Sequence, residues 1–80
     1  MEKLDYQKIC QQILEPLNSA QKEVLERRFG LVSAEKETLE SIGEDFELTR
    51  ERIRQIEKEA FLKLQRQKEE RMVKQIFFSL

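Results

Sequence analysis

Hydrogen-bonding side chains recur at helical spacing in the stretch TRERIRQIEKE, residues 49–59. With about 100° between successive residues of an α-helix, five of these side chains fall within one arc of about 140°. They are Arg50, Glu51, Arg54, Gln55 and Lys58. Arg can donate two hydrogen bonds to guanine, Gln can pair with adenine, and Glu can accept from cytosine. Arg54, Lys58 and a helix N-terminus at Thr49 suit phosphates, so the pattern is typical of a nucleic-acid-binding face.

The opposite side of the same predicted helix is apolar. Ile53, Ile56, Ala60 and Leu64 fall within about 80° of each other, which favours packing of this side on the domain. The polar side has a second interpretation, because charge pairs four residues apart also occur on helices that face only solvent. Periodicity alone leaves both interpretations open.

The elements that must position this helix can also be predicted. Apolar residues from Tyr6 to Leu17 follow helical spacing, Asp5 is a candidate N-cap, and Pro16 disfavours helical geometry at Glu15. The predicted inner face of this first helix contains Tyr6, Ile9, Cys10, Ile13, Leu14 and Leu17.

A second helix follows, capped by Asn18 with Gln21 as its capping-box partner and closed by Gly30. Its predicted inner face contains Ala20, Val24, Leu25 and Phe29. The segment 31–37 is expected to be a polar loop.

The third and fourth helices lie close together in the sequence. Thr38 can cap a short helix with Leu39, Ile42 and Phe46 on its apolar side, and Gly43 permits close approach of a second helix. After a tight connection at Leu48, Thr49 caps a fourth helix without Pro or Gly. This last helix either runs long or bends near residues 65–70. We therefore expect an all-α domain of four to five helices that contains a helix-turn-helix.

Charge is distributed unevenly along the 80 residues. The net charge is −1, but residues 1–49 carry six basic and eleven acidic side chains, whereas residues 50–80 carry nine and five. The first part therefore has a net charge of −5 and the second of +4. We expect any contact with nucleic acid to come from the second part.

The residue types exclude several other kinds of site. Cys10 is the single cysteine, interpreted as a core side chain, and there is no histidine, which excludes a Cys/His zinc site and an internal disulfide. Because no nucleophile stands beside a base and no Gly-rich phosphate loop is present, we expect no enzyme, cofactor or small-molecule substrate. No apolar run approaches the roughly 18 residues of a membrane span, and the N-terminus is unlike a signal peptide. A cytoplasmic chain without a membrane partner is expected.

The amino-acid sequences of two segments resemble those of a known family. The run TLESIGEDFELTRERIRQIEKEAFLKL, residues 38–64, resembles the helix-turn-helix in region 4 of sigma-70 family RNA polymerase sigma factors. The run LNSAQKEVLERRFGL, residues 17–31, resembles the helix before it. The most specific parts are TRERIRQIE and RRFGL at the expected separation.

The resemblance implies a role for individual residues. Arg50, Glu51 and Gln55 correspond to readers of base edges in the minus-35 promoter element. Residues expected at the DNA backbone are Thr49, Arg54, Lys58, Arg52, Leu39, Glu40 and Arg28. Arg28 and Arg52 could equally be ordinary surface charges. Family members commonly carry basic residues at the positions of Glu59 and Leu62, so fewer phosphate contacts are expected here.

The chain after the matched region has no counterpart in this resemblance. It contains an apolar group that is a candidate partner-binding surface: Met72, Val73, Ile76, Phe77 and Phe78. Such a group folds back on the core, meets a partner, or continues into further chain. We expect a region 4-like domain over residues 1–64, with its helix-turn-helix at 38–64, and a helical extension over 65–80.

The resemblance implies promoter recognition in bacterial transcription initiation, with double-stranded promoter DNA and the beta flap of the RNA polymerase core as partners. An anti-sigma or activator protein is a further expected partner. The alternative is a protein-interaction module that binds the polymerase flap or an anti-sigma regulator, with weak or no DNA binding. The near-neutral charge, Glu59 and the apolar residues after 71 favour this alternative.

Overall fold

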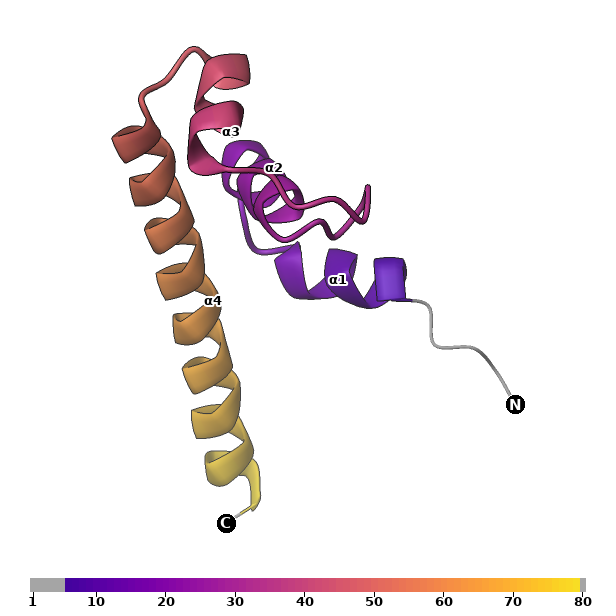
Figure 1. Cartoon of the computed structure of the whole chain (residues 1–80). Helices are drawn as coiled ribbons and strands as arrows, with labels where there is room; N and C mark the ends of the chain where they lie inside the picture. Colours follow the sequence, from indigo (N-terminus) through magenta and orange to yellow (C-terminus); the bar gives the residue numbers. More distant parts are fainter. Residues whose placement is uncertain (1–5, 80) are drawn as a thin grey trace, which may run out of the picture.

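The computed structural model describes residues 6–79, which form four α-helices and no strand (Figure 1). The helices are α1 (Tyr6–Leu14), α2 (Ser19–Arg28), α3 (Leu39–Phe46) and α4 (Arg50–Ser79). The predicted all-α class with a helix-turn-helix is therefore confirmed. Of the two forms expected for the last helix, the structure has the long one, an unbroken α4 of 30 residues. The expected N-cap Asp5 lies outside the described residues.

Local signals in the sequence fix most of the helix ends. The Asn18 Oδ1 accepts a hydrogen bond from the Gln21 backbone N–H at 2.8 Å, and the Gln21 side chain accepts from the Asn18 N–H at 3.2 Å. This capping box begins α2 as predicted. At the other end, Gly30 adopts a left-handed φ of 64°, which a residue with a Cβ rarely adopts. α1 ends at Leu14, before Pro16.

The core lies between α2, α3 and the first half of α4, with the end of α1 below it (Figure 1). One cluster of buried side chains joins α1, α2 and α4 and consists of Leu14, Leu17, Leu25 and Ala60. A second cluster joins α2, α3 and α4 and consists of Val24, Ile42, Ile53 and Ile56. The second cluster holds α3 against the start of α4, which is the element predicted to contact DNA.

The predicted inner face of α1 is fully buried only near its C-terminal end. Cys10 is half-buried, and the side chain of Tyr6 lies outside the described ones. Leu14 and Leu17 are buried, but Ile9 and Ile13 are exposed. The physical reason is the direction of the helix, because α1 meets the domain at its last turn and its start points away from α4 (Figure 1). The other helices therefore do not cover the whole apolar stripe.

The buried face of α2 is also narrower than predicted. Val24 and Leu25 are buried, whereas Ala20 is exposed. Phe29 is half exposed, and its ring packs edge-on against Phe61 of α4 with 5.8 Å between the centroids. The apolar side of α2 thus packs on the core through a short central segment, and Phe29 directly after α2 adds one aromatic contact with α4.

Candidate nucleic-acid interface

The turn between α3 and α4 sets the position of the candidate reading helix. Glu47 ends α3 in the left-handed conformation with a φ of 56°, and the Leu48 N–H donates to the Gly43 carbonyl at 2.9 Å. Thr49 caps α4 as predicted, because its Oγ1 accepts a hydrogen bond from the Arg52 N–H at 3.0 Å. Three residues therefore reverse the chain and lead directly into α4.

Close approach of backbone at Gly43 makes this turn tight. A Cβ at Gly43 would lie 2.7 Å from the carbonyl oxygen of Leu48, well inside van der Waals contact. The expectation of a close approach at this glycine is correct, although the approaching atom belongs to the turn rather than to a second helix. The glycine thus fixes the spacing between α3 and the start of α4.

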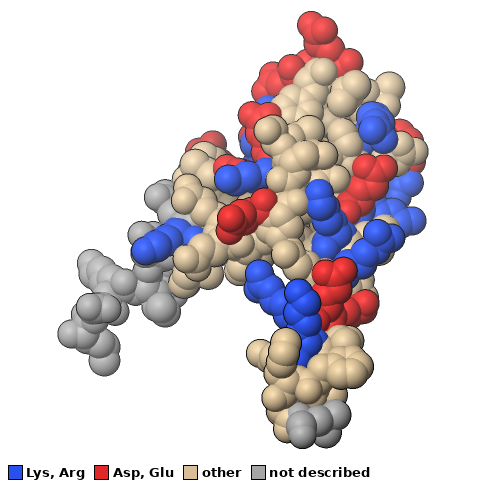
Figure 2. All heavy atoms as spheres, turned by 180° about the vertical axis from the view of Figure 1, so that it is seen from behind, with Lys and Arg blue, Asp and Glu red and all other residues tan. Residues whose placement is uncertain are grey.

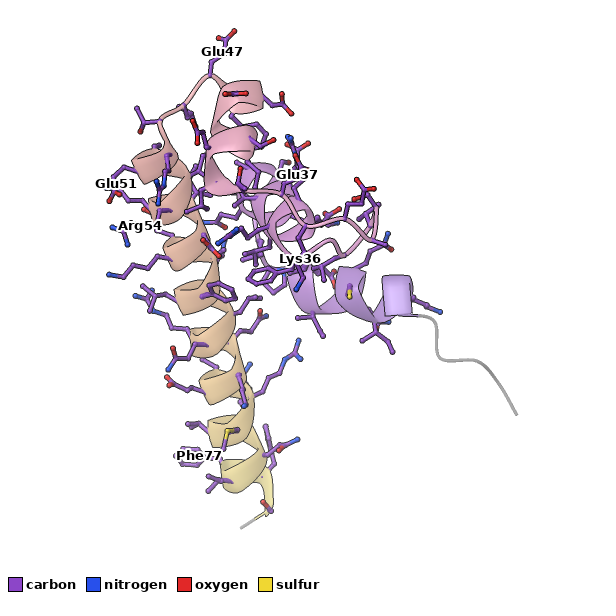
Figure 3. The ribbon with its side chains drawn as sticks, viewed as in Figure 1. Lys36, Glu37, Glu47, Glu51, Arg54 and Phe77 are labelled. Atoms are coloured by element: carbon purple, nitrogen blue, oxygen red, sulfur yellow. The ribbon has the colours of Figure 1, made fainter. Side chains whose placement is uncertain are left out.

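The polar face of α4 is exposed along its first turns. The five side chains that share this face are Arg50, Glu51, Arg54, Gln55 and Lys58, and all are exposed. On the opposite side, Ile53, Ile56 and Ala60 are buried in the core. Figure 3 shows Glu51 and Arg54 projecting from α4 on the side away from α2 and α3. Both halves of the predicted two-sided pattern are therefore present.

An ion pair between Arg54 and Glu51 organises this face. Arg54 binds Glu51 through Nη2 at 2.6 Å from Oε1, with Nε 3.1 Å from both carboxylate oxygens. Hydrogen bonding to Arg54 holds the pKa of Glu51 below its usual value, and the same contact raises the pKa of Arg54. The carboxylate of Glu51 therefore stays ionised and acts as a hydrogen-bond acceptor.

Arg52 connects the candidate reader Gln55 with an acidic side chain one turn further on. Its Nη1 donates to the Gln55 Oε1 at 3.2 Å and lies 3.8 Å from the Glu59 Oε1. Glu59 thus has a local role as the counter-ion of Arg52. This ion pair competes with any phosphate for the same guanidinium group.

Residues far apart in the sequence meet in a hollow beside the start of α4. The hollow has a volume of about 320 Å³ and is lined by Arg28, Thr38, Leu39, Glu40 and Arg50. It contains the N-terminus of α3, where the Thr38 Oγ1 accepts a hydrogen bond from the Ser41 N–H at 3.1 Å. A helix start with a neighbouring arginine is the arrangement that binds phosphate oxygens.

Arg28 lines this hollow but is also engaged within the domain. Its Nη1 donates to the Glu37 carbonyl at 3.2 Å, and its Nε lies 3.7 Å from the Glu57 Oε1. These contacts connect the end of α2 with the loop before α3 and with α4. They hold the guanidinium group at the edge of the hollow.

Arg27 forms a network that the sequence analysis missed. Its Nε and Nη2 donate to the Glu37 carboxylate at 2.8 and 2.7 Å, it also binds Asp45, and its guanidinium lies 5.8 Å from the centre of the Phe46 ring. Hydrogen bonding to Arg27 lowers the pKa of Glu37, with a smaller contribution from Ser41. The partners are ten and eighteen residues away along the chain, so local spacing gave no signal. The network fixes the loop and α3 relative to α2.

The apolar residues near the C-terminus do not fold back on the core. Met72, Val73, Ile76, Phe77 and Phe78 are between 50% and 88% exposed. Figure 3 shows Phe77 projecting from the far end of α4, where the helix has left the rest of the domain. In Figure 2 this end carries a continuous uncharged surface, whereas basic and acidic side chains alternate further up the helix. The first of the three arrangements expected for this group is therefore wrong.

Residues 6–79 offer neither a metal-binding cluster nor a membrane-spanning helix. Between residues 6 and 79, no group of three or more His, Cys, Asp or Glu side chains is arranged to hold a metal ion. Within this part of the chain, no helix has the length and apolarity needed to cross a membrane. The thiol of Cys10 is free and half-buried.

Comparisons with known proteins converge on one group. A family model described as "Sigma-70, region 4" matches residues 13–66. RNA polymerase sigma factor RpoD of Neisseria gonorrhoeae is 46% identical over 56 residues, which cover 70% of this chain and 9% of the relative. The RpoD of Helicobacter pylori is 49% identical over 53 residues, covering 65% and 8%. Sigma factor SigA of Lactococcus lactis subsp. cremoris is 45% identical over 53 residues, covering 66% and 15%. The chain thus spans only a small part of the length of these relatives.

Proposed function

The chain belongs to the sigma-70 region 4 family, and from this premise we propose that it recognises the minus-35 element of bacterial promoters during transcription initiation. The observation that supports the proposal most strongly is the exposed polar face at the start of α4, held in place by the short turn after α3. The major groove of B-DNA admits an α-helix, and helix-turn-helix proteins place the start of their second helix there. The proposal assigns no catalytic step to the chain.

The proposed base readers are Arg50, Glu51 and Gln55. They lie within the first two turns of α4 and are exposed. Arg50 is suited to the O6 and N7 of guanine, Gln55 to the N6 and N7 of adenine, and the ionised Glu51 to the amino group of cytosine. Each well-formed bidentate contact contributes about 1–3 kcal/mol of discrimination between bases.

Phosphates of the DNA backbone are proposed to bind around this face. The hollow beside Arg28 supplies the main-chain N–H groups of Leu39 and Glu40 at the start of α3. The side chains proposed to contact the backbone from α4 and its cap are Thr49, Arg52, Arg54 and Lys58. Arg52 must leave Glu59, and Arg54 must share Glu51, before either guanidinium can bind a phosphate fully.

The charges predict weak binding by the isolated chain. Each neutralised phosphate contributes about 0.9 to the slope of log K against log salt concentration. Glu59 and Leu62 stand where family members commonly have basic residues, so the slope for this chain should be shallower than for those members. We propose that contact with the RNA polymerase core, through its flap, supplies the missing affinity, and that the chain acts in the bacterial cytoplasm.

Gln55→Ala tests the proposal directly. Fluorescence anisotropy with duplexes that contain or lack a minus-35 element should show a preference for the element, and Gln55→Ala should weaken specific binding by about 5–150-fold, the equivalent of 1–3 kcal/mol. Gln65→Ala is the matched control, because Gln65 is also exposed on α4 but lies about four turns beyond the helix start. Equal binding of both duplexes, or no effect of Gln55→Ala, would contradict base reading.

A protein-interaction module is the second candidate function, and the exposed apolar residues after 71 favour it. In this case the flap of the polymerase, or an anti-sigma or activator protein, is the main ligand. Binding to RNA polymerase core that is unchanged by Gln55→Ala and Arg50→Ala, without binding to any duplex, would support this candidate over promoter reading.

We also propose a functional division of the chain near residue 64. Residues 1–64, with the helix-turn-helix at 38–64, form the part that contacts DNA, and residues 65–80 form a helical extension. The family model extends to residue 66, which is consistent with this division. A chain ending at residue 66 should then keep the DNA preference of the full chain.

A further inference from the structure

The residue before the N-cap of α3 is held to the end of α2 at three points. The Glu37 N–H donates to the Arg27 carbonyl at 3.0 Å, and the Glu37 carbonyl accepts from the Arg28 Nη1 at 3.2 Å. The Glu37 carboxylate accepts two hydrogen bonds from the Arg27 guanidinium, at 2.8 and 2.7 Å. The next residue, Thr38, is the N-cap of α3. The contacts of Glu37 therefore set the place where α3 begins.

The ion pair between Arg27 and Glu37 is shielded and has two hydrogen bonds. The side chains are 20% and 29% exposed, and the paired N–H···O bonds fix the orientation of both groups. The Ser41 hydroxyl donates to the same carboxylate at 3.4 Å, which connects it with the first turn of α3. The guanidinium also binds Asp45 in the last turn of α3 and lies 5.8 Å from the centre of the Phe46 ring. One side chain of α2 thus determines the position of α3 near both of its ends.

The groups proposed to bind a DNA phosphate lie directly beside this network. The hollow of about 320 Å³ is lined by Arg28, Thr38, Leu39, Glu40 and Arg50. Its lining includes neither Arg27 nor Glu37. An α-helix leaves its first N–H groups without a partner inside the helix, and in α3 the Thr38 side chain accepts from the third of them, Ser41. The N–H groups of Leu39 and Glu40 therefore remain for a phosphate.

We infer that Arg27 and Glu37 are positioning residues for phosphate binding at the start of α3, although neither is proposed to touch the DNA. The inference rests on the proposed function and adds two residues to it. The pair holds the N–H groups of Leu39 and Glu40 at a fixed place beside the Arg28 guanidinium, so that one phosphate meets both at once. Without the pair these groups must be ordered during binding, and this ordering lowers the affinity.

Charge and positioning predict opposite results for Glu37→Ala. Because DNA is an anion, the loss of one carboxylate strengthens binding if only the net charge matters. If Glu37 positions the start of α3, its loss weakens binding to any duplex on the order of tenfold, which is about one charge-assisted hydrogen bond. Glu35→Ala is the matched control, because Glu35 is exposed in the same loop and its replacement changes the net charge equally. This control should bind as tightly as the wild type or slightly more tightly.

Fluorescence anisotropy of the full chain over a series of salt concentrations measures the change. The slope of log K against log salt concentration should be smaller by about 0.9 in Glu37→Ala than in Glu35→Ala, because one phosphate contact is lost. The preference for a duplex with the minus-35 element should not change, because the proposed base readers lie on α4. A partly unfolded chain loses affinity at an unchanged slope, so the slope separates positioning from folding.

Arg27→Lys is a second variant that keeps the net charge. The lysine ammonium cannot form the two parallel hydrogen bonds that the guanidinium forms with Glu37. Binding to both duplexes should therefore weaken although the charge of the chain is the same. Circular dichroism of each variant confirms that the helices are retained. An Arg27→Lys chain and a Glu37→Ala chain that both bind as tightly as the wild type would overturn the inference.

Amide resonances in NMR spectra give the most direct test. On addition of duplex DNA, the backbone amides of Leu39 and Glu40 should shift in the wild type and in Glu35→Ala, and much less in Glu37→Ala. The side-chain amide of Gln55 should shift in all three chains. Equal shifts of Leu39 and Glu40 in all three would also overturn the inference, and promoter reading would stand.

Failure of the proposed function gives a different result. A wild-type chain that binds both duplexes equally contradicts base reading, but the comparison of Glu37→Ala with Glu35→Ala still decides the role of the ion pair. A wild-type chain that binds no duplex even at low salt concentration overturns both the proposed function and the inference.

Discussion

Replacement of Gly43 by alanine should lower the stability of the domain, although helix propensity alone predicts an increase. Gly43 lies within α3, where alanine stabilises an exposed helix by about 1 kcal/mol relative to glycine. At this position, however, the new Cβ would lie 2.7 Å from the Leu48 carbonyl oxygen. That oxygen belongs to backbone, so it cannot turn aside as a flexible side chain could.

The expected cost follows from the contacts around this glycine. Ordinary van der Waals contact begins near 3.4 Å, so the turn must move by several tenths of an ångström away from α3. Overpacking of this kind costs about 1–3 kcal/mol. The movement also stretches the hydrogen bond from the Leu48 N–H to the Gly43 carbonyl, now 2.9 Å long, which contributes about 1 kcal/mol. After subtraction of the propensity gain, Gly43→Ala should destabilise the domain by about 1–3 kcal/mol.

Urea unfolding followed by circular dichroism measures this change. Glu44→Ala is the control, because Glu44 is exposed at the next position of α3 and its replacement should change stability by less than about 0.5 kcal/mol. DNA affinity should fall in Gly43→Ala even where the domain is folded, because the start of α4 has moved. A Gly43→Ala chain more stable than the wild type by about 1 kcal/mol would show that propensity acts unopposed and would refute the close approach.

Two further predictions concern the same region. Glu47 holds a left-handed φ of 56° in the turn, so Glu47→Gly should raise the free energy of unfolding by about 0.5–1 kcal/mol in urea titrations, and a loss of stability would contradict this strain. The second prediction concerns Glu37, whose pKa is lowered in the folded state mainly by hydrogen bonding to Arg27. Its contribution to stability is therefore present above the ordinary carboxyl pKa and is lost as the pH falls through the lower folded value. Thermal unfolding across the acidic range should show this loss, and the pH dependence should be smaller in Arg27→Gln.

The sequence predicted the elements that depend on neighbouring residues. The capping box at Asn18, the left-handed Gly30, the cap at Thr49 and the two-sided pattern of α4 were all recognisable within a few positions. Each depends on contacts between residues no more than about four apart, apart from the glycine, which depends on its own φ. The exposed polar face of α4 could be predicted for the same reason, because its members share one helix.

Other features required knowledge of which helix faces meet. The exposure of Ile9 and Ile13 follows from the direction in which α1 leaves the domain, and periodicity does not contain that direction. The apolar positions of α1 were therefore predicted to be more deeply buried than they are. The same ambiguity applied to the apolar residues after 71, whose composition was compatible with folding back on the core.

The sequence by itself determined where the helices begin, which face of α4 is polar, and which family the motif resembles. Only the tertiary structure brought Arg27 to Glu37 and Asp45, gathered Arg28, Leu39 and Arg50 around one hollow, and left the end of α4 uncovered. The physical reason is the separation in sequence between the residues that interact. Caps and amphipathic stripes are interactions over a few residues, whereas these features depend on the packing of helices whose contacting side chains lie ten or more residues apart.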